Sequence, residues 1–73
     1  MLMIEILAQI QADGDKPFTA GIVLWDGVVV EAAPIVGYMK KRKWTRDQVR
    51  EYCNRRGWKI EVVHQLERKR EPH

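Results

Sequence analysis

The sequence has 73 residues, of which 45% are hydrophobic and 32% charged, and a formal net charge of +3. A chain of this length forms one small domain, which buries only about 60% of the surface that its unfolded form exposes. The composition excludes intrinsic disorder, and no apolar run approaches the roughly 20 residues that cross a bilayer. Cys53 is the only cysteine, which excludes an internal disulfide and favours a reducing compartment. The first apolar segment has no basic leader, so the sequence predicts a cytoplasmic protein without a secretory signal.

The charge is divided unevenly along the chain. Residues 1–33 carry one basic and five acidic side chains, a net charge of −4. Residues 34–73 carry twelve basic and five acidic side chains, a net charge of +7. A strongly basic half of this kind indicates a nucleic acid or an acidic protein as partner.

The first half of the chain predicts three strands. Residues 1–12 alternate between apolar and polar side chains, which is typical of a strand with one buried face. Aspartate, glycine and proline in residues 13–17 favour a reversal of the chain. Residues 18–25 and 28–33 then flank Asp26-Gly27, the pair that favours a type I′ hairpin turn because both positions need positive φ. This turn predicts three facing pairs, namely Trp25 with Val28, Leu24 with Val29 and Val23 with Val30.

The clearest helix signal lies in residues 45–56. Thr45 is followed three positions later by Gln48, the capping-box spacing in which each side chain bonds a backbone N–H of the first turn. An apolar stripe at helical spacing includes Cys53, and Gly57 supplies the left-handed residue that commonly ends a helix.

The remaining segments complete the predicted fold. Residues 33–40 indicate a short helix that begins at a proline, and residues 58–66 alternate as a final strand, with His64 on its apolar face. Residues 67–73 are charged and predicted to form a flexible tail. Together these elements predict a two-layer α+β domain in residues 1–66, with the order β-β-β-α-α-β and an antiparallel sheet of about four strands under one main helix.

The sequence predicts no enzyme, no cofactor and no metal site. It contains no serine and none of the common phosphate-loop, CxxC or HExxH motifs. Cys53 lies in an apolar stripe, which favours a packed thiol over a nucleophile with His64 as its base. Asp13 and Asp15 carry oxygen ligands for a hard cation, but two carboxylates around Gly14 serve turn geometry directly.

A basic run follows the predicted short helix. Four adjacent cations repel one another and have no obvious task in local structure, which favours contact with phosphates, although a solubilising loop is the alternative. Trp44, beside the run, either stacks on a base or packs onto the first helical turn. The candidate residues for binding nucleic acid or another partner are Lys40, Lys41, Arg42, Lys43, Trp44, Arg46 and Arg50.

The charges of the main helix limit how it could bind. Asp47 and Glu51 occupy the centre of its outer face, which disfavours insertion of this helix into the major groove. The spacing predicts ion pairs of Asp47 with Arg50 and of Glu51 with Arg55, each worth a few tenths of a kcal/mol.

Two segments, FTAGIVLWDGVVVEAAPIVGYM and WTRDQVREYCNRRGWKIEVV, carry a family resemblance. With their F-x-A-G, D-G, A-A-P-I and R-G-W pieces, residues 18–63 resemble small uncharacterised proteins encoded in bacteriophage and prophage regions. The resemblance implies a phage accessory protein in the cytoplasm of a bacterial host, and it implies no catalytic residues.

Three functions follow as hypotheses. The first is a non-enzymatic protein that binds the phosphates of DNA or RNA through the basic run. The second is a stoichiometric inhibitor of a host defence protein, such as an anti-CRISPR protein. The third is a structural homo-oligomer such as a homodimer, because both faces of the hairpin around Asp26-Gly27 are apolar. None of these involves a membrane.

Overall fold

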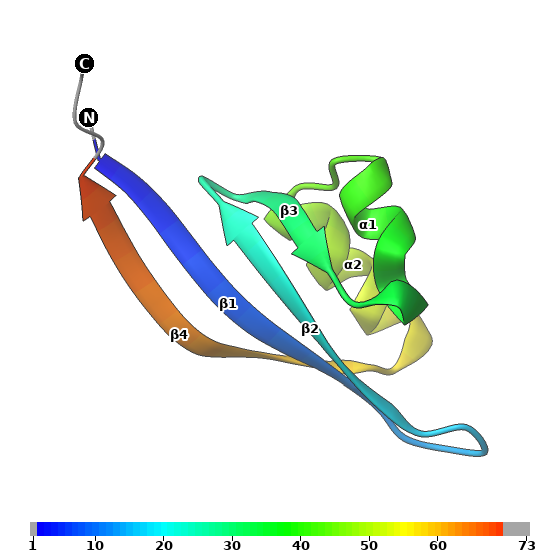
Figure 1. The fold of residues 1–73 in the computed structure, drawn as a ribbon. Coiled ribbons are helices and arrows are strands. Elements are labelled where there is room, and N and C mark those ends of the chain that lie inside the picture. The colour runs from blue at the N-terminus through cyan, green and yellow to red at the C-terminus, as the bar shows by residue number, and fades with distance from the viewer. Residues whose placement is uncertain (1, 70–73) are drawn as a thin grey trace.

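The computed structural model describes residues 2–69, and Figure 1 shows helices covering one face of a sheet. The sheet has four antiparallel strands in the order β3-β2-β1-β4. The α+β class and the order of strands and helices predicted from the sequence are confirmed. The elements are β1 (Leu2–Ala12), β2 (Phe18–Trp25), β3 (Val28–Ala32), a 3₁₀ turn (Pro34–Val36), α1 (Gly37–Lys41), α2 (Arg46–Arg56) and β4 (Lys59–Lys69).

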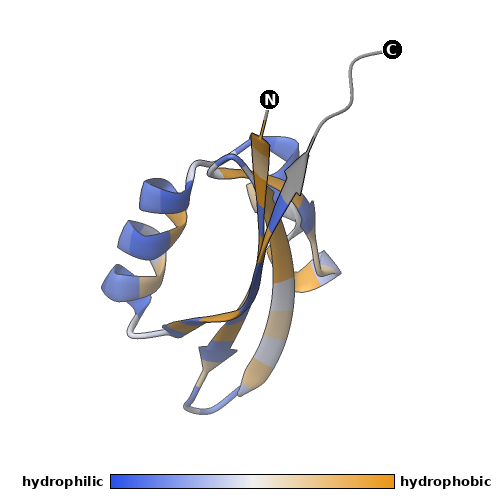
Figure 2. Cartoon of the chain, turned by 90° about the vertical axis from the view of Figure 1, so that its left-hand side faces the viewer, coloured by the Kyte–Doolittle hydropathy of each residue, from blue (hydrophilic) through white to orange (hydrophobic). Residues whose placement is uncertain are grey.

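The hydrophobic core lies between the helices and the covered face of the sheet. Alternate residues of β1, namely Ile6, Ala8 and Ile10, are at most 5% exposed there. Figure 2 shows that α2 turns its more hydrophobic side toward the sheet and its hydrophilic side away from it. The other core residues come from β2, β3, the 3₁₀ turn and both helices, and they are Ala20, Ile22, Leu24, Val29, Val36, Met39, Val49 and Cys53.

The first residues of β1 lie beyond the helical layer. Leu2 and Ile4 continue the apolar alternation, but they are 63% and 37% exposed. Figure 1 shows this end of β1, with the end of β4 beside it, extending away from the helices. The predicted burial of these two side chains is therefore wrong, because no helix covers this end of the sheet.

The main helix forms as its capping signals predict. The Thr45 side chain accepts a hydrogen bond from the Gln48 backbone N–H at 3.3 Å, and the Gln48 side chain accepts one from the Thr45 N–H at 2.9 Å. Gly57 ends the helix with a φ of 71°. The short helix predicted in residues 33–40 is a 3₁₀ turn followed directly by α1.

The β2–β3 turn connects three parts of the fold. Asp26 and Gly27 have φ angles of 52° and 81°, as the type I′ turn requires. On one side, Asp26 exchanges two hydrogen bonds with Ile4 of β1, a backbone bond of 2.9 Å and a side-chain bond of 3.0 Å. On the other side, the Arg46 N–H donates to the Gly27 carbonyl at 2.7 Å. These bonds hold the first turn of α2 beside the hairpin.

Two bulges change the register that the sequence predicts. The pairs nearest the turn are confirmed, but Val23 faces Glu31 instead of Val30. An extra residue in β3, Val30, therefore lies between the paired positions. The outer edge of β3 is already bound to the segment entering α2 through the bridge of Val28 with Thr45. Beyond that bridge the bulge increases the bend and twist of the strand.

The second bulge lies in β4 and reverses the predicted faces of its last residues. Ala8 pairs with Val62, whereas Leu7 pairs with His64, so Val63 is the extra residue. Facing residues share one face of a sheet, so His64 lies with Leu7 on the side away from the helices. The predicted place of His64 on the covered apolar face is wrong, because an inserted residue shifts every later side chain to the other face. The same shift places Leu66 on the face away from the helices as well.

The last strand is longer than predicted. Glu67, Arg68 and Lys69 pair with Ile4, Met3 and Leu2 of β1. The first three residues assigned to the flexible tail therefore belong to β4, and residues 70–73 of that tail lie outside the described part of the chain.

Candidate nucleic-acid interface

Lys40 stands apart from the rest of the basic run. It lies in α1, which packs beside β3, and its Nζ atom is 3.2 Å from both carboxylate oxygens of Glu31. Both side chains are exposed, so the pair stabilises the fold by only a few tenths of a kcal/mol. Its consequence is electrostatic, because Glu31 neutralises the first cation of the run.

The next three cations lie at the end of α1 and in the connection to α2. Lys41 ends α1, Arg42 caps it, and Lys43 adopts a left-handed φ of 50°. This conformation costs a residue with a side chain about 1 kcal/mol. Within residues 2–69 all three side chains are exposed, and none has a carboxylate within ion-pair distance.

Trp44 belongs to a cluster of aromatic rings on one flank of α2. Its ring centroid is 5.4 Å from that of Tyr38 and 5.0 Å from that of Tyr52, both edge-to-face. Tyr52 also packs against Trp58 at 5.5 Å. The guanidinium of Arg56 lies 4.8 Å above the Tyr52 ring and 5.4 Å from the Trp58 ring. Packing accounts for Trp44, and base stacking by this ring stays a prediction.

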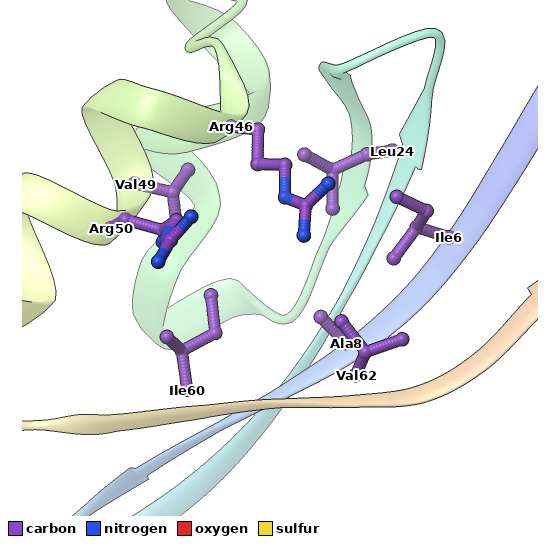
Figure 3. Close-up of a pocket in the computed structure, with 8 residues that line it drawn as sticks. All are labelled: Ile6, Ala8, Leu24, Arg46, Val49, Arg50, Ile60 and Val62. Carbon is purple, nitrogen blue, oxygen red and sulfur yellow. The ribbon is translucent and has the colours of Figure 1, made fainter.

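One of the two ion pairs predicted in α2 forms. Arg55 donates to the Glu51 carboxylate at 2.6 Å, which confirms that pair. Among residues 2–69 the Asp47–Arg50 pair does not form. Arg50 instead lines a cavity together with Arg46 (Figure 3). The two guanidinium groups on this flank of α2 therefore stand without a carboxylate partner in the described structure.

Arg46 and Arg50 line a cavity of about 210 Å³ between α2 and the sheet. In Figure 3 their side chains reach from α2 over an apolar floor supplied by three strands. Within the described part of the chain no acidic side chain lines this space. The apolar lining residues are Ile6, Ala8, Leu24, Val49, Ile60 and Val62.

The bulge in β4 sets the extent of this floor. Ile60 and Val62 face Ile10 and Ala8 of β1 on the helix side of the sheet. Beyond Val63 the face reverses, so that Gln65 is the next β4 residue on this side. The apolar surface of β4 ends there, and Val62 is 45% exposed at its border.

This arrangement suits an anion joined to an apolar group. A guanidinium presents five donors in a planar fork that matches phosphate and carboxylate oxygens, and it is more weakly hydrated than an ammonium. Sequence reasoning placed Arg46 and Arg50 on one flank of the helix but missed the cavity beneath them. Val49 was the available signal for the cavity. It lies in the same helical turn, and an apolar residue there indicates that this flank lies near the core.

The structure keeps Cys53 and His64 apart. Cys53 is 1% exposed on the covered face, and burial raises the pKa of its thiol. His64 is exposed on the opposite face of the sheet. In residues 2–69 no three His, Cys, Asp or Glu side chains come together as metal ligands. Asp13 and Asp15 lie in the exposed connection between β1 and β2, where Gly14 has a φ of 119°.

Comparison with known proteins identifies no relative: no family model, curated protein or solved structure matches this chain. None of the helices in residues 2–69 is long and apolar enough to span a membrane.

Proposed function

We propose that this chain is a non-enzymatic protein that binds nucleic-acid phosphates through five cations, which we call the basic corner. Its residues are Lys41, Arg42, Lys43, Arg46 and Arg50. The observation that carries the proposal is their freedom from ion pairs: in the described structure all five are exposed and none has a carboxylate partner. By contrast, Lys40 forms an ion pair with Glu31, and Arg55 forms one with Glu51.

The geometry of the connection supports this proposal. The capping box holds the start of α2, and the bond from the Arg46 N–H to Gly27 ties it to the hairpin. These bonds fix the first turn of α2, where Arg46 lies, and the connection that carries Arg42 and Lys43 leads directly into this turn. A protein that neutralises several phosphates releases their counterions, which makes its affinity steeply dependent on salt. Its preference for sequence is expected to be weak, because phosphate contacts carry no sequence information.

Fluorescence anisotropy tests the proposal with labelled single-stranded DNA, duplex DNA and RNA at two salt concentrations. The wild type should bind, and its affinity should fall as salt rises. The double variant Arg46→Gln and Arg50→Gln should bind at least tenfold more weakly. On single strands, the slope of log affinity against log salt should fall by about 1.4 for two lost phosphate contacts.

A matched control separates a site from general charge. Lys16→Gln with Lys59→Gln removes the same two positive charges from exposed positions on the β1–β2 turn and the start of β4. This control should bind nearly as well as the wild type. Equal losses in both double variants would reduce the basic corner to non-specific attraction, and no binding at low salt would remove the proposed function.

Self-association is a second candidate, favoured by the sheet face away from the helices, the open face. On this face Trp25 and Leu66 flank Glu5 in adjacent strands, and they are 42% and 40% exposed. The Trp25 ring is held in place by a 2.8 Å hydrogen bond from its Nε1 atom to Glu5. An apolar face that also exposes Leu7 is a candidate interaction surface. Light scattering should give twice the chain mass at high micromolar concentration, and a monomeric mass would remove this candidate.

A further inference from the structure

We infer that the cavity beneath Arg46 and Arg50 receives one unpaired base of a single-stranded nucleic acid, while the two guanidinium groups bind the phosphates beside that base. This inference rests on the proposed function and adds to it the kind of strand and the place of the base. It follows from a cavity with an apolar floor and a cationic rim, formed where α2 and β4 diverge (Figure 3).

The cavity opens where the helix leaves β4 uncovered. Ala8 and Leu24 at its floor are each 2% exposed, whereas Val62 at its border is 45% exposed. A flat group placed over Val62 would cover the exposed apolar surface at the mouth of the cavity. Its burial would remove apolar surface of both ligand and protein from water, which is favourable by about 25 cal/mol per Å².

The size of the cavity limits what enters it. Pockets for drug-sized ligands and cofactors span about 300 to 1,000 Å³, and this cavity is smaller, at about 210 Å³. It therefore suits a single ring system more than a whole dinucleotide cofactor. A base that carries a phosphate on either side combines such a ring with the anions that the rim selects.

The rim residues suit this ligand in a second way. A guanidinium plane stacks on a base and also donates paired hydrogen bonds to phosphate oxygens. Arg46 and Arg50 lie one helical turn apart on the same flank, so they provide two successive contacts along a backbone. Lys41, Arg42 and Lys43 lie just before α2 in the chain and supply further exposed positive charge.

A duplex fits this site poorly. Its bases are paired and stacked, and extruding one costs a few kcal/mol. The outer face of α2 also carries the carboxylate of Asp47, which repels phosphates and disfavours placement of the helix in a groove. A single strand avoids both penalties.

The experiment compares an octamer of thymidylate with an abasic octamer that has the same phosphates and no bases. Anisotropy titrations at one low salt concentration should show that the wild type binds the thymidylate octamer about tenfold more tightly. Equal affinity for the two octamers would overturn the inference, because the phosphates alone would then account for binding.

Two valine variants locate the base. Val62→Phe places a ring at the mouth of the cavity and removes no charge, so it should lower affinity for the thymidylate octamer about tenfold and leave affinity for the abasic octamer unchanged. Val63→Phe is the matched control. Val63 is also exposed, at 55%, but it is the bulge residue and does not line the cavity. This control should keep the wild-type preference, and thermal unfolding verifies that both variants are folded.

The outcomes separate this inference from the proposed function. Salt-sensitive binding that is equal for both octamers and unaffected by Val62→Phe would retain the basic corner and overturn base insertion. Absence of binding to every nucleic acid would remove both. A loss of the thymidylate preference in Val62→Phe alone would support both at once.

Discussion

The two flanks of α2 pack against the rest of the protein in different ways. On one flank, Trp44, Tyr52 and Trp58 fill the space beside the helix with edge-to-face rings. On the other flank a cavity lies beneath Arg46 and Arg50, and among residues 2–69 its lining includes no aromatic ring. The two flanks also differ in whether their cations have partners within the protein.

The charges follow the packing. On the ring-filled flank Arg56 stacks over Tyr52 and Trp58, and Arg55 pairs with Glu51 close by. On the cavity flank the two arginines have no carboxylate partner within the described residues. We therefore predict that the first flank serves stability and the second serves binding, and substitutions on each flank test that division.

The largest expected effect is on the ring-filled flank. Tyr52 contacts the rings of Tyr38, Trp44 and Trp58. Tyr52→Ala should lower the free energy of unfolding by about 3 kcal/mol, at the low end for aromatic truncations because the ring is only partly buried. Urea denaturation measures this loss.

The control for that variant lies on the cavity flank. Val62→Ala removes an apolar side chain that is 45% exposed, so its cost should stay below about 1 kcal/mol. Similar costs for Tyr52→Ala and Val62→Ala would contradict the assignment of stability to the ring-filled flank.

The next effect is a dependence of stability on alkaline pH, through Tyr38 in the same ring cluster. Burial, together with the adjacent Tyr52, raises the pKa of Tyr38 from 10.0 to about 12. The folded state therefore holds this proton over a range where the unfolded state has lost it. The stabilising contribution is complete below about pH 10 and disappears as the pH rises toward 12.

Replacing the titrating group measures that contribution. The urea midpoint of the wild type should fall as the pH rises above 10, and Tyr38→Phe should show a smaller fall over the same interval. Cys53 is present in both proteins, so its own raised thiol pKa cancels from the difference. Identical slopes for the two proteins would show that Tyr38 is not held protonated by the fold.

Local sequence chemistry predicted much of this architecture. The Thr45–Gln48 capping box and the Asp26-Gly27 turn each depend on a few adjacent residues, and both form as expected. The alternation in β1 predicted its buried side correctly through the middle of the strand. It failed for Leu2, because burial there depends on whether a helix extends that far, which alternation does not encode.

The bulges and the cavity could not be predicted from adjacent residues. The extra residues Val30 and Val63 look like ordinary strand residues, since a bulge depends on how paired strands twist against each other and against the layer above. The cavity follows from the same cause, because its floor ends where the Val63 bulge reverses β4. Arg46 and Arg50 were identified as binding candidates from their shared flank, but the floor beneath them comes from distant strands.

The smallest expected effect compares one arginine from each flank. Arg56→Gln removes a cation that lies over two rings, and it should lower the free energy of unfolding by about 0.5 to 1 kcal/mol. Arg50→Gln removes a cation without an ion pair in the described structure, and it should change the free energy of unfolding by less than about 0.5 kcal/mol. Affinity for the thymidylate octamer should show the reverse order, with the larger loss in Arg50→Gln.

This crossed pattern is the sharpest test of the comparison, because both variants lose one positive charge from the same helix. A protein in which charge alone matters would lose equal affinity in the two variants. A protein in which Arg50 mainly shields the core with its aliphatic stem would lose stability in Arg50→Gln and keep its affinity. Only a division between a stabilising flank and a binding flank makes stability fall with Arg56 and binding fall with Arg50.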